Sequence, residues 1–486
     1  MLKIHVSKEI PTDCNTLIIP ILKFGAEPKN IFKNLSGAKN IPKRLMDEIK
    51  GEAKEITAFF TGDTKVYVIG LGEKASYTTI LSAFKNFAFS QKTKLSVNIA
   101  IDFSTNAILD THENIQAAVN GLMLSVYNVG LYKTEEKEKA FALNERNVEL
   151  HILSYNVHDT KSAKRGLDIA ETQMRVMDLV NMSPNKKIPE VLSDWAVASG
   201  KTFGYDVQVF DKAACEKNNL HALLSVNAGS EFEPRFIIME YKPANAIKKI
   251  GIVGKGVTFD TGGISIKPAS NMHLMKSDMG GAAAVFGAVE LAAKLKLPVH
   301  LIGIVPSTEN MVDGKSTKPG DVIGSYLGKT IEVIDTDAEG RLILADALAY
   351  LKKNFNPDSM IDLATLTGSV IRTLGYAAAG LFSNNDDLSN ELIQAGDYTG
   401  ERLWRLPLWE EYKDDIKSDV ADVANFSGKM HAGAISAAKF LEVFIDGHTS
   451  WAHLDIAGTA LATNDLGGQR VATAFGVHLL LRFLEQ

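Results

Sequence analysis

Four carboxylates and three basic side chains gather in and between two short glycine-rich blocks of this 486-residue chain. Carboxylate oxygens are hard donors that suit divalent cations, and glycines let the backbone approach a small site closely. Four anionic ligands are enough to neutralise two dications, so these residue types indicate a two-metal hydrolase. The acidic residues are Asp260, Asp278, Asp337 and Glu339, and the basic residues are Lys255, Lys267 and Arg341.

Such a cluster can do more than bind ions. Two cations about 3.5–4 Å apart can hold a bridging water, lower its pKa and polarise a substrate carbonyl. Lys255 can serve as a nitrogen ligand if its amine is neutral. Lys267 and Arg341 then remain as positive charges that can stabilise an oxyanion or hold an anionic base. Amide hydrolysis fits this set, because it passes through an anionic tetrahedral intermediate. Taken singly, each residue also fits a turn or a helix cap.

The composition limits the class of protein. A chain of this length predicts about two domains, and 45% hydrophobic with 23% charged residues is typical of a globular protein. A net charge of −6 argues against a chain dominated by nucleic-acid binding, although a local basic patch remains possible. The two cysteines, Cys14 and Cys215, favour neither a disulfide framework nor a thiolate zinc site. With no long apolar run and no signal peptide, we expect no membrane span and a cytoplasmic location.

The pattern of elements predicts a small N-terminal α/β domain over residues 1–160. Short apolar runs alternate there with turns and with a helical stretch at Ile115–Tyr127. A long helical pattern over Ala163–Val180 follows and ends before Pro184. The strand-like runs are Thr16–Leu22, Lys65–Gly72, Leu95–Ile101 and Val148–Leu153.

Residues 161–486 predict a larger domain with a mostly parallel sheet covered by helices on both faces. Ligands of such sheets bind outside the carboxyl ends of the strands. Lys255 and Asp260 follow one strand-like run, and Asp337 and Glu339 follow another, so we expect all of them at one edge. The runs are Phe236–Tyr241, Lys249–Val253, Val299–Val305, Thr330–Ile334 and Met360–Leu363, and the helical patterns include Ala282–Lys296 and Leu342–Lys353.

Both blocks resemble those of the cytosol (leucyl) aminopeptidase family of dinuclear metallopeptidases. The segment Asp335–Leu342 matches seven of the eight positions in the family sequence Asn-Thr-Asp-Ala-Glu-Gly-Arg-Leu. The block Gly254–Lys267 and the segment Asp278–Ala283 match as well, with family-like spacing. The similarity covers roughly residues 165–480, whereas the N-terminal part resembles the family only in size and pattern.

The resemblance implies a role for each position. Asp260 and Glu339 would bridge two divalent ions, zinc or manganese. Asp337 would complete the first ion's site, and Lys255 with Asp278 the second. Further implied roles are carbonyl polarisation by Lys267, a bicarbonate general base held by Arg341, and a pocket for the first substrate side chain formed by Met275, Thr365 and Gly368.

The resemblance also implies a peptide substrate with an apolar first residue such as leucine, and a homohexamer. One position departs from the family: Asp335 stands where the family has Asn, which adds a fifth carboxylate and leaves metal preference open.

Two other functions remain as alternatives. One is a DNA-binding regulator with secondary peptidase activity, kept open by the lysine-rich N-terminal part, and the other is a catalytically dead scaffold.

Overall fold

The computed structural model describes residues 2–23, 31–32, 34–35, 41–134, 143, 148–463 and 470–486. The chain divides into two compact units, and the division falls between Met174 and Arg175. Helix α4 (Lys161–Asn181) therefore contains the boundary, which the sequence pattern placed near the start of this helix. No helix in the described ranges combines the length and the apolar character needed to cross a bilayer.

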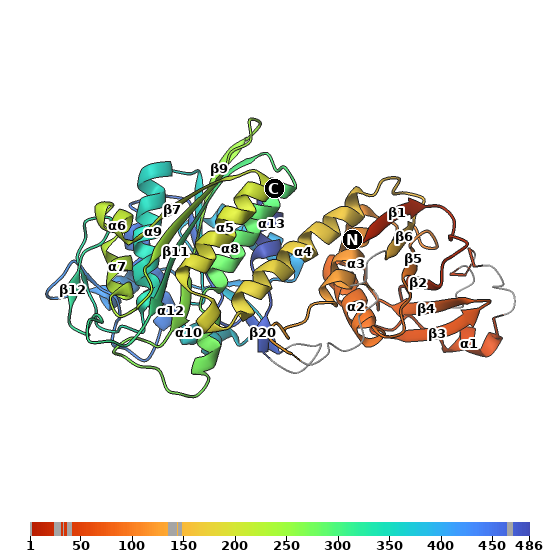
Figure 1. The fold of residues 1–486 in the computed structure, drawn as a ribbon, viewed down its shortest axis with the longest axis horizontal. Helices are drawn as coiled ribbons and strands as arrows, with labels where there is room; N and C mark the ends of the chain where they lie inside the picture. The colour runs from red at the N-terminus through yellow and green to blue at the C-terminus, as the bar shows by residue number, and fades with distance from the viewer. Residues whose placement is uncertain are drawn as a thin grey trace. The chain divides into compact units, whose positions relative to one another are not determined.

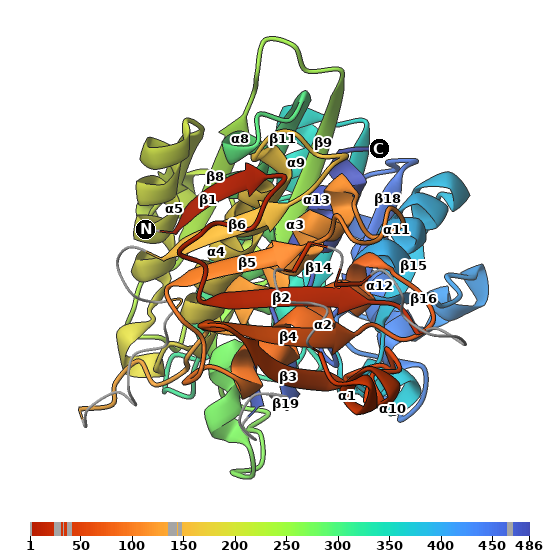
Figure 2. The ribbon, with the colours of Figure 1, turned by 90° about the vertical axis from the view of Figure 1, so that its right-hand side faces the viewer.

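The N-terminal unit contains a six-stranded sheet in the order β1-β6-β5-β2-β4-β3 (Figure 2). Neighbouring strands are parallel except for β3 and β4. Leu17, Ile19 and Val68 belong to its core, as expected for strands with a buried face. The elements are β1 (Lys3–Ser7), β2 (Thr16–Ile21), α1 (Lys43–Glu48), β3 (Ile56–Thr61), β4 (Thr64–Gly70), α2 (Tyr77–Ser90), β5 (Asn98–Asp102), α3 (His112–Leu124) and β6 (Glu149–Leu153).

The second unit is built on a larger sheet in the order β16-β15-β18-β14-β9-β11-β8-β7, with β10 beside β11. Its central strands β18, β14, β9 and β11 are parallel, while β15, β8 and β7 add antiparallel edges. The predicted mostly parallel sheet is thus confirmed. The strands are β7 (Asp206–Phe210), β8 (Arg235–Tyr241), β9 (Lys248–Gly254), β10 (Gly256–Asp260), β11 (Val299–Asn310), β14 (Ser359–Ala364), β15 (Ala379–Ser383), β16 (Leu403–Arg405) and β18 (Trp451–Asp455).

Helices cover both faces of this sheet (Figure 1). Side chains alternate along β9, so Gly251 and Gly254 face opposite sides. Gly251 lies against Leu351 of α9, and Gly254 against Gly281 of α8. Helices α5 and α13 pack beside α8, and α7 and α12 beside α9. The helices are α5 (Pro189–Phe203), α6 (Lys212–Lys217), α7 (His221–Asn227), α8 (Gly280–Lys294), α9 (Glu339–Phe355), α10 (Gly368–Leu374), α11 (Asp386–Thr399), α12 (Gly433–Phe444) and α13 (Val477–Leu484), with 3-10 turns η3 (Pro184–Lys186), η4 (Met272–Ser277) and η5 (Glu410–Ile416).

One predicted strand of the main sheet was wrong. Within Thr330–Ile334, only Ile331–Glu332 (β13) is a strand, and it pairs with β12 (Val322–Ile323) and β17 (Val423–Ala424) in a small side sheet. The run ends early because the backbone N–H of Ile334 donates to the side chain of Asn425 and leaves the strand ladder. A two-stranded sheet of β19 (Leu461–Thr463) and β20 (Arg470–Ala472) completes the unit.

Candidate metal centre and substrate cavity

The candidate ligands come together at the carboxyl ends of the strands, from four separate elements. Lys255 follows β9, and Asp260 is the last residue of β10. Asp278 follows η4, Glu339 is the first residue of α9, and Asp337 lies just before that helix. The expected convergence is therefore observed, although Asp337 and Glu339 reach the site from a loop and a helix start rather than from a strand of the main sheet.

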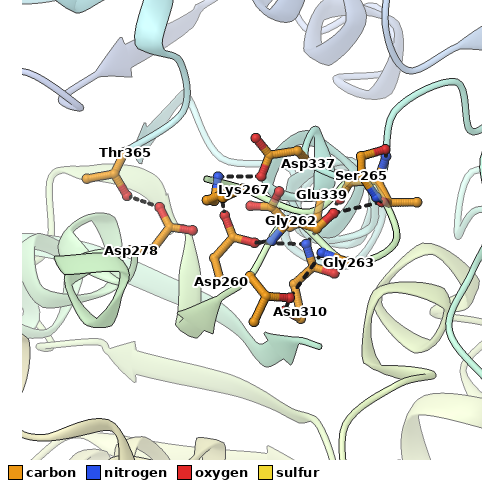
Figure 3. A network of polar contacts seen from close by, with 12 residues as sticks. Asp260, Gly262, Gly263, Ser265, Lys267, Asp278, Asn310, Asp337, Glu339 and Thr365 are labelled. Atoms are coloured by element: carbon orange, nitrogen blue, oxygen red, sulfur yellow. Dashed lines mark hydrogen bonds and ion pairs between the residues drawn. The ribbon is translucent and has the colours of Figure 1, made fainter. Parts of the chain in front are cut away.

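Two lysine ammonium groups lie among the carboxylates, and Figure 3 shows one of them, Lys267, beside Asp260 and Asp337. Lys255 Nζ is 2.7 Å from both Asp278 Oδ2 and Glu339 Oε1. Lys267 Nζ is 2.9 Å from Asp260 Oδ2 and also pairs with Asp337. In this arrangement the ammonium groups stand where cations would neutralise the crowded acids.

Burial and mutual repulsion shift the protonation of this cluster. Burial, followed by Asp260 and Glu339, raises the pKa of Asp337 to about 7. Burial also raises the pKa of Asp278, which Lys255 only partly offsets. For Lys255, burial alone would lower the pKa, but the surrounding carboxylates outweigh it and raise the pKa. In the absence of other cations, Lys255 is thus protonated. Its nitrogen can bind a metal only after it loses one proton.

Neighbouring polar groups fix the orientation of the carboxylates. Asp260 Oδ1 accepts hydrogen bonds from Asn310 Nδ2 and from the backbone N–H of Gly262, both at 2.8 Å. Thr365 Oγ1 donates to Asp278 Oδ1 at 2.7 Å. No motif in the sequence marks Asn310, yet it is the last residue of β11, where an apolar run gives way to the polar end Ser-Thr-Glu-Asn, and this change is the signal that could have found it.

A glycine makes room for Lys255. A Cβ added to Gly340 would lie 2.6 Å from Lys255 Cε and 2.7 Å from Nζ, much closer than real contacts allow. Any larger residue at position 340 would displace the lysine from Glu339. Gly340 of the second block therefore leaves the space that the Lys255 side chain of the first block occupies.

The oxygen donors fit divalent cations. Asp260, Asp337 and Glu339 each offer one oxygen, and these atoms all lie within 4.8 Å of one another. Glu339 Oε2 is buried without a hydrogen-bond partner in the described part of the chain. Buried polar atoms normally have partners, so this oxygen is placed for a ligand outside the polypeptide.

Arg341 is buried beside the cluster, and one of its donors is free for a ligand. Its guanidinium donates to the backbone oxygen of Asn425 at 2.7 Å, whereas Nε is without a hydrogen-bond partner among the described residues. Burial lowers the pKa of Arg341 to about 10, against the opposing effect of Glu339. Asn425 also binds Asp335, since its Nδ2 donates to the backbone oxygen of Asp335 at 2.7 Å. Nothing in the sequence around Asn425 marked it for this role.

The Asp335 side chain makes a hydrogen bond that an asparagine side chain could also make. Its Oδ1 accepts the backbone N–H of Asp337 at 2.9 Å, an Asx turn that needs only one side-chain oxygen. We therefore expect Asp335→Asn to keep kcat/KM within about threefold, because the amide oxygen restores the same turn. Steady-state kinetics with each metal would check this, and a larger change would assign the extra charge a direct effect on the centre.

The cluster forms part of the wall of a cavity of about 1060 Å³. Met275, Thr365 and Gly368, the three residues expected for substrate contact, also line it. The cavity is of the size that small-molecule sites have. The seven clustered residues line it, apart from Glu339, which lies behind the lining with both carboxylate oxygens buried.

Asp455 holds the Thr365–Gly368 loop in place. Its Oδ2 accepts from Thr367 Oγ1 at 2.6 Å, and its Oδ1 accepts the backbone N–H of Leu366 at 3.1 Å. These contacts fix the loop that lines the cavity from the end of strand β18. His453, on the same strand, is fully buried and its Nδ1 lies 2.6 Å from Asp362 Oδ1.

Lys187 anchors the turn that carries Met275. This lysine is fully buried, and its Nζ donates to the backbone oxygens of Leu179 and Val180 at 2.9 Å and to that of Lys276. Three carbonyls use all three protons of an ammonium group. The side chain thereby ties η4 to the last turn of α4.

We expect Lys187→Met to lower the free energy of unfolding by roughly 3–5 kcal/mol, because each orphaned buried carbonyl costs about 1–3 kcal/mol. KM should rise as the Met275 turn loosens. Urea titration and steady-state kinetics measure both effects. Lys186→Met is the matched control, since Lys186 is exposed. Equal stability of the two variants would contradict the anchoring role.

Comparison with known proteins agrees with the fold. The cytosol aminopeptidase family model for the catalytic domain matches residues 174–481, and the model for the N-terminal domain of that family matches residues 45–136. A probable cytosol aminopeptidase of Chloroherpeton thalassium is 46% identical over 437 residues, 86% of each chain. Another from Chlorobium limicola is 42% identical over 462 residues, 91% of each chain.

A solved structure extends the likeness to the whole fold. The bottromycin maturation enzyme BotP in complex with Mn has a TM-score of 0.84 and 30% identity, covering 97% of this chain and 99% of its own. The fold and the family match thus place this chain in a class of metal-dependent peptidases. The chain is a member of the cytosol aminopeptidase family, and it is a metal-dependent aminopeptidase. The resemblance of the two blocks is thereby confirmed.

Proposed function

We propose that this enzyme removes the N-terminal residue of peptides and prefers apolar residues such as leucine. The observation that carries the proposal is the convergence of five ligand-type side chains on one cavity. When bound, two divalent ions, zinc or manganese, would supply an activated water and a polarised substrate carbonyl. The residues that would hold them are Lys255, Asp260, Asp278, Asp337 and Glu339.

Lys267 would stabilise the negative charge that develops on the substrate. Its side chain is partly exposed to the cavity, and its only ion pairs among the described residues are with two candidate ligands. Dications on Asp260 and Asp337 would release the ammonium group from these pairs. A positive charge held in a sheltered cavity favours an oxyanion in the transition state.

Arg341 would hold a bicarbonate ion as general base. Four carboxylates balance two dications, and the fifth carboxylate, Asp335, offsets only one of the two positive charges of Lys267 and Arg341, so the remaining positive charge attracts an anion. The unsatisfied Nε of Arg341 offers it a buried donor. Bicarbonate added to carbonate-depleted buffer should therefore raise the activity of the wild type but not of Arg341→Met, whereas equal responses would remove bicarbonate from the scheme.

The preference for apolar residues rests on the cavity wall. The cavity that Met275, Thr365 and Gly368 line also has several aliphatic members, and an aliphatic surface favours an aliphatic substrate side chain over a charged one. Its apolar members include Leu366, Ile371, Ala457, Ala460 and Leu461.

The direct test is hydrolysis of a series of amino-acid p-nitroanilides after loading with Mn²⁺ or Zn²⁺. We expect turnover of the leucine substrate to exceed that of the aspartate and lysine substrates, and to stop on addition of a chelator. An N-acetylated leucine substrate is the control, because it lacks the free amine. Turnover of the blocked substrate would contradict an aminopeptidase, and equal turnover of all side chains would contradict the leucine preference.

We also propose a homohexamer in the cytoplasm. Cys14 and Cys215 are free and buried, which suits a reducing compartment. Light scattering of the tag-free protein measures the mass, and any value other than six chains would overturn the assembly proposal without affecting the reaction.

A further inference from the structure

A group of metal-type ligands lies in the N-terminal unit, separate from the residues described above. His5 belongs to β1, and Glu149 and His151 belong to β6. The two strands are parallel neighbours (Figure 2), and His5 lies directly opposite His151 in their register. Side chains alternate along a strand, so Glu149, two residues before His151, points to the same face.

Both imidazoles converge on one carboxylate oxygen. His5 Nε2 lies 3.7 Å and His151 Nε2 3.8 Å from Glu149 Oε2. The rings stack with centroids 4.7 Å apart and planes at 17°. Zinc binds nitrogen and oxygen ligands at about 2.0–2.2 Å, so ligand atoms in a tetrahedron are about 3.3–3.6 Å apart. The two distances to Glu149 exceed this range by a few tenths of an ångström, and all three ligand atoms lie within 4.8 Å of one another, so closing the group on an ion requires the two stacked rings to tilt toward each other.

The remaining interactions leave the ligand atoms available. Glu149 Oε1 pairs with Lys3 Nζ at 3.3 Å, which orients the carboxylate and keeps Oε2 for the imidazoles. The side chains of His5, Glu149 and His151 are 45%, 32% and 14% exposed, so an ion can enter from solvent.

We propose that His5, Glu149 and His151 form a binding site for a zinc-type divalent ion that ties the edge strand β1 to β6. Two imidazole nitrogens and one carboxylate oxygen make a three-ligand zinc set, with the fourth position open to water. Calcium and magnesium prefer oxygen donors alone. The site differs in kind from the carboxylate centre, whose candidate ligands include no imidazole.

This difference makes the test specific. The tag-free full-length chain is loaded with Zn²⁺ and studied by zinc X-ray absorption, because imidazole ligands give outer-shell scattering that carboxylates and amines lack. We expect imidazole scattering in the wild type. We expect this scattering to disappear in His5→Ala and in His151→Ala. Each variant should also bind one zinc fewer per chain, or bind that zinc at least tenfold more weakly. Peptidase activity should be unchanged.

His158→Ala is the matched control, since His158 is an exposed histidine of the same unit and should leave the signal intact. Glu149→Gln keeps an oxygen for Lys3 but removes the anionic ligand, so it should weaken zinc binding. This variant provides the test if a histidine variant fails to fold. A wild type without imidazole scattering would overturn the proposal. So would scattering that persists in both histidine variants, because the zinc would then be bound by other histidines.

Discussion

Glu339→Gln is expected to lower kcat/KM on the order of a thousandfold, about 4 kcal/mol of transition-state stabilisation. Glu339 Oε2 is buried without a hydrogen-bond partner among the described residues, and Glu339 Oε1 lies 2.7 Å from Lys255 Nζ. An amide cannot supply a second anionic oxygen to a pair of cations. Kinetics with saturating Mn²⁺ and metal analysis of the purified variant measure the loss.

The control for Glu339→Gln is the same substitution at Glu332. That residue lies on β13, where its Oε2 accepts a hydrogen bond from Ser418 Oγ at 2.5 Å, and it does not line the cavity. We expect Glu332→Gln to retain wild-type activity and the metal-induced rise in Tm, and Glu339→Gln to lose both. More than a tenth of the activity remaining in Glu339→Gln would rule out its role as a metal ligand.

Lys267→Met is expected to lower kcat by about 10²–10³, the cost of removing one positioned oxyanion donor. The physical reason differs from that for Glu339. Lys267 neutralises Asp260 and Asp337 in this structure, and cations on those acids would replace it in that role. The variant should therefore keep its metal content while it loses turnover, which metal analysis beside kinetics can separate.

Lys429→Met serves as the control for a lost positive charge in the same cavity. Lys429 also lines the cavity, but its ammonium group pairs with Asp415. Its loss should change kcat by less than about threefold. If Lys267→Met kept kcat within tenfold of the wild type, or lost its metal as well, Lys267 would be a structural counter-charge rather than a group that stabilises the transition state.

The convergence of the acidic and basic side chains could be predicted from the sequence, because both blocks are contiguous and their chemistry is local. Asp337, Glu339 and Arg341 lie within one short segment, and the turn into α9 brings them together. The apolar runs that became β9, β11 and β14 were also readable, since strands buried on both faces are nearly continuous in apolar residues. The exception was Thr330–Ile334, where a side-chain partner from another segment ended the strand.

The amino-acid sequence by itself thus determined which side chains can bind cations and which strands must place them at one edge. Only the tertiary structure decided which groups orient them: Asn310 reaches Asp260 across 50 residues, and Asn425 reaches Arg341 across 84. It also decided that His5 would meet His151, through the pairing of β1 with β6. The physical reason is that ligand chemistry belongs to single residues, whereas orientation and burial arise when distant segments pack against one another and exclude water.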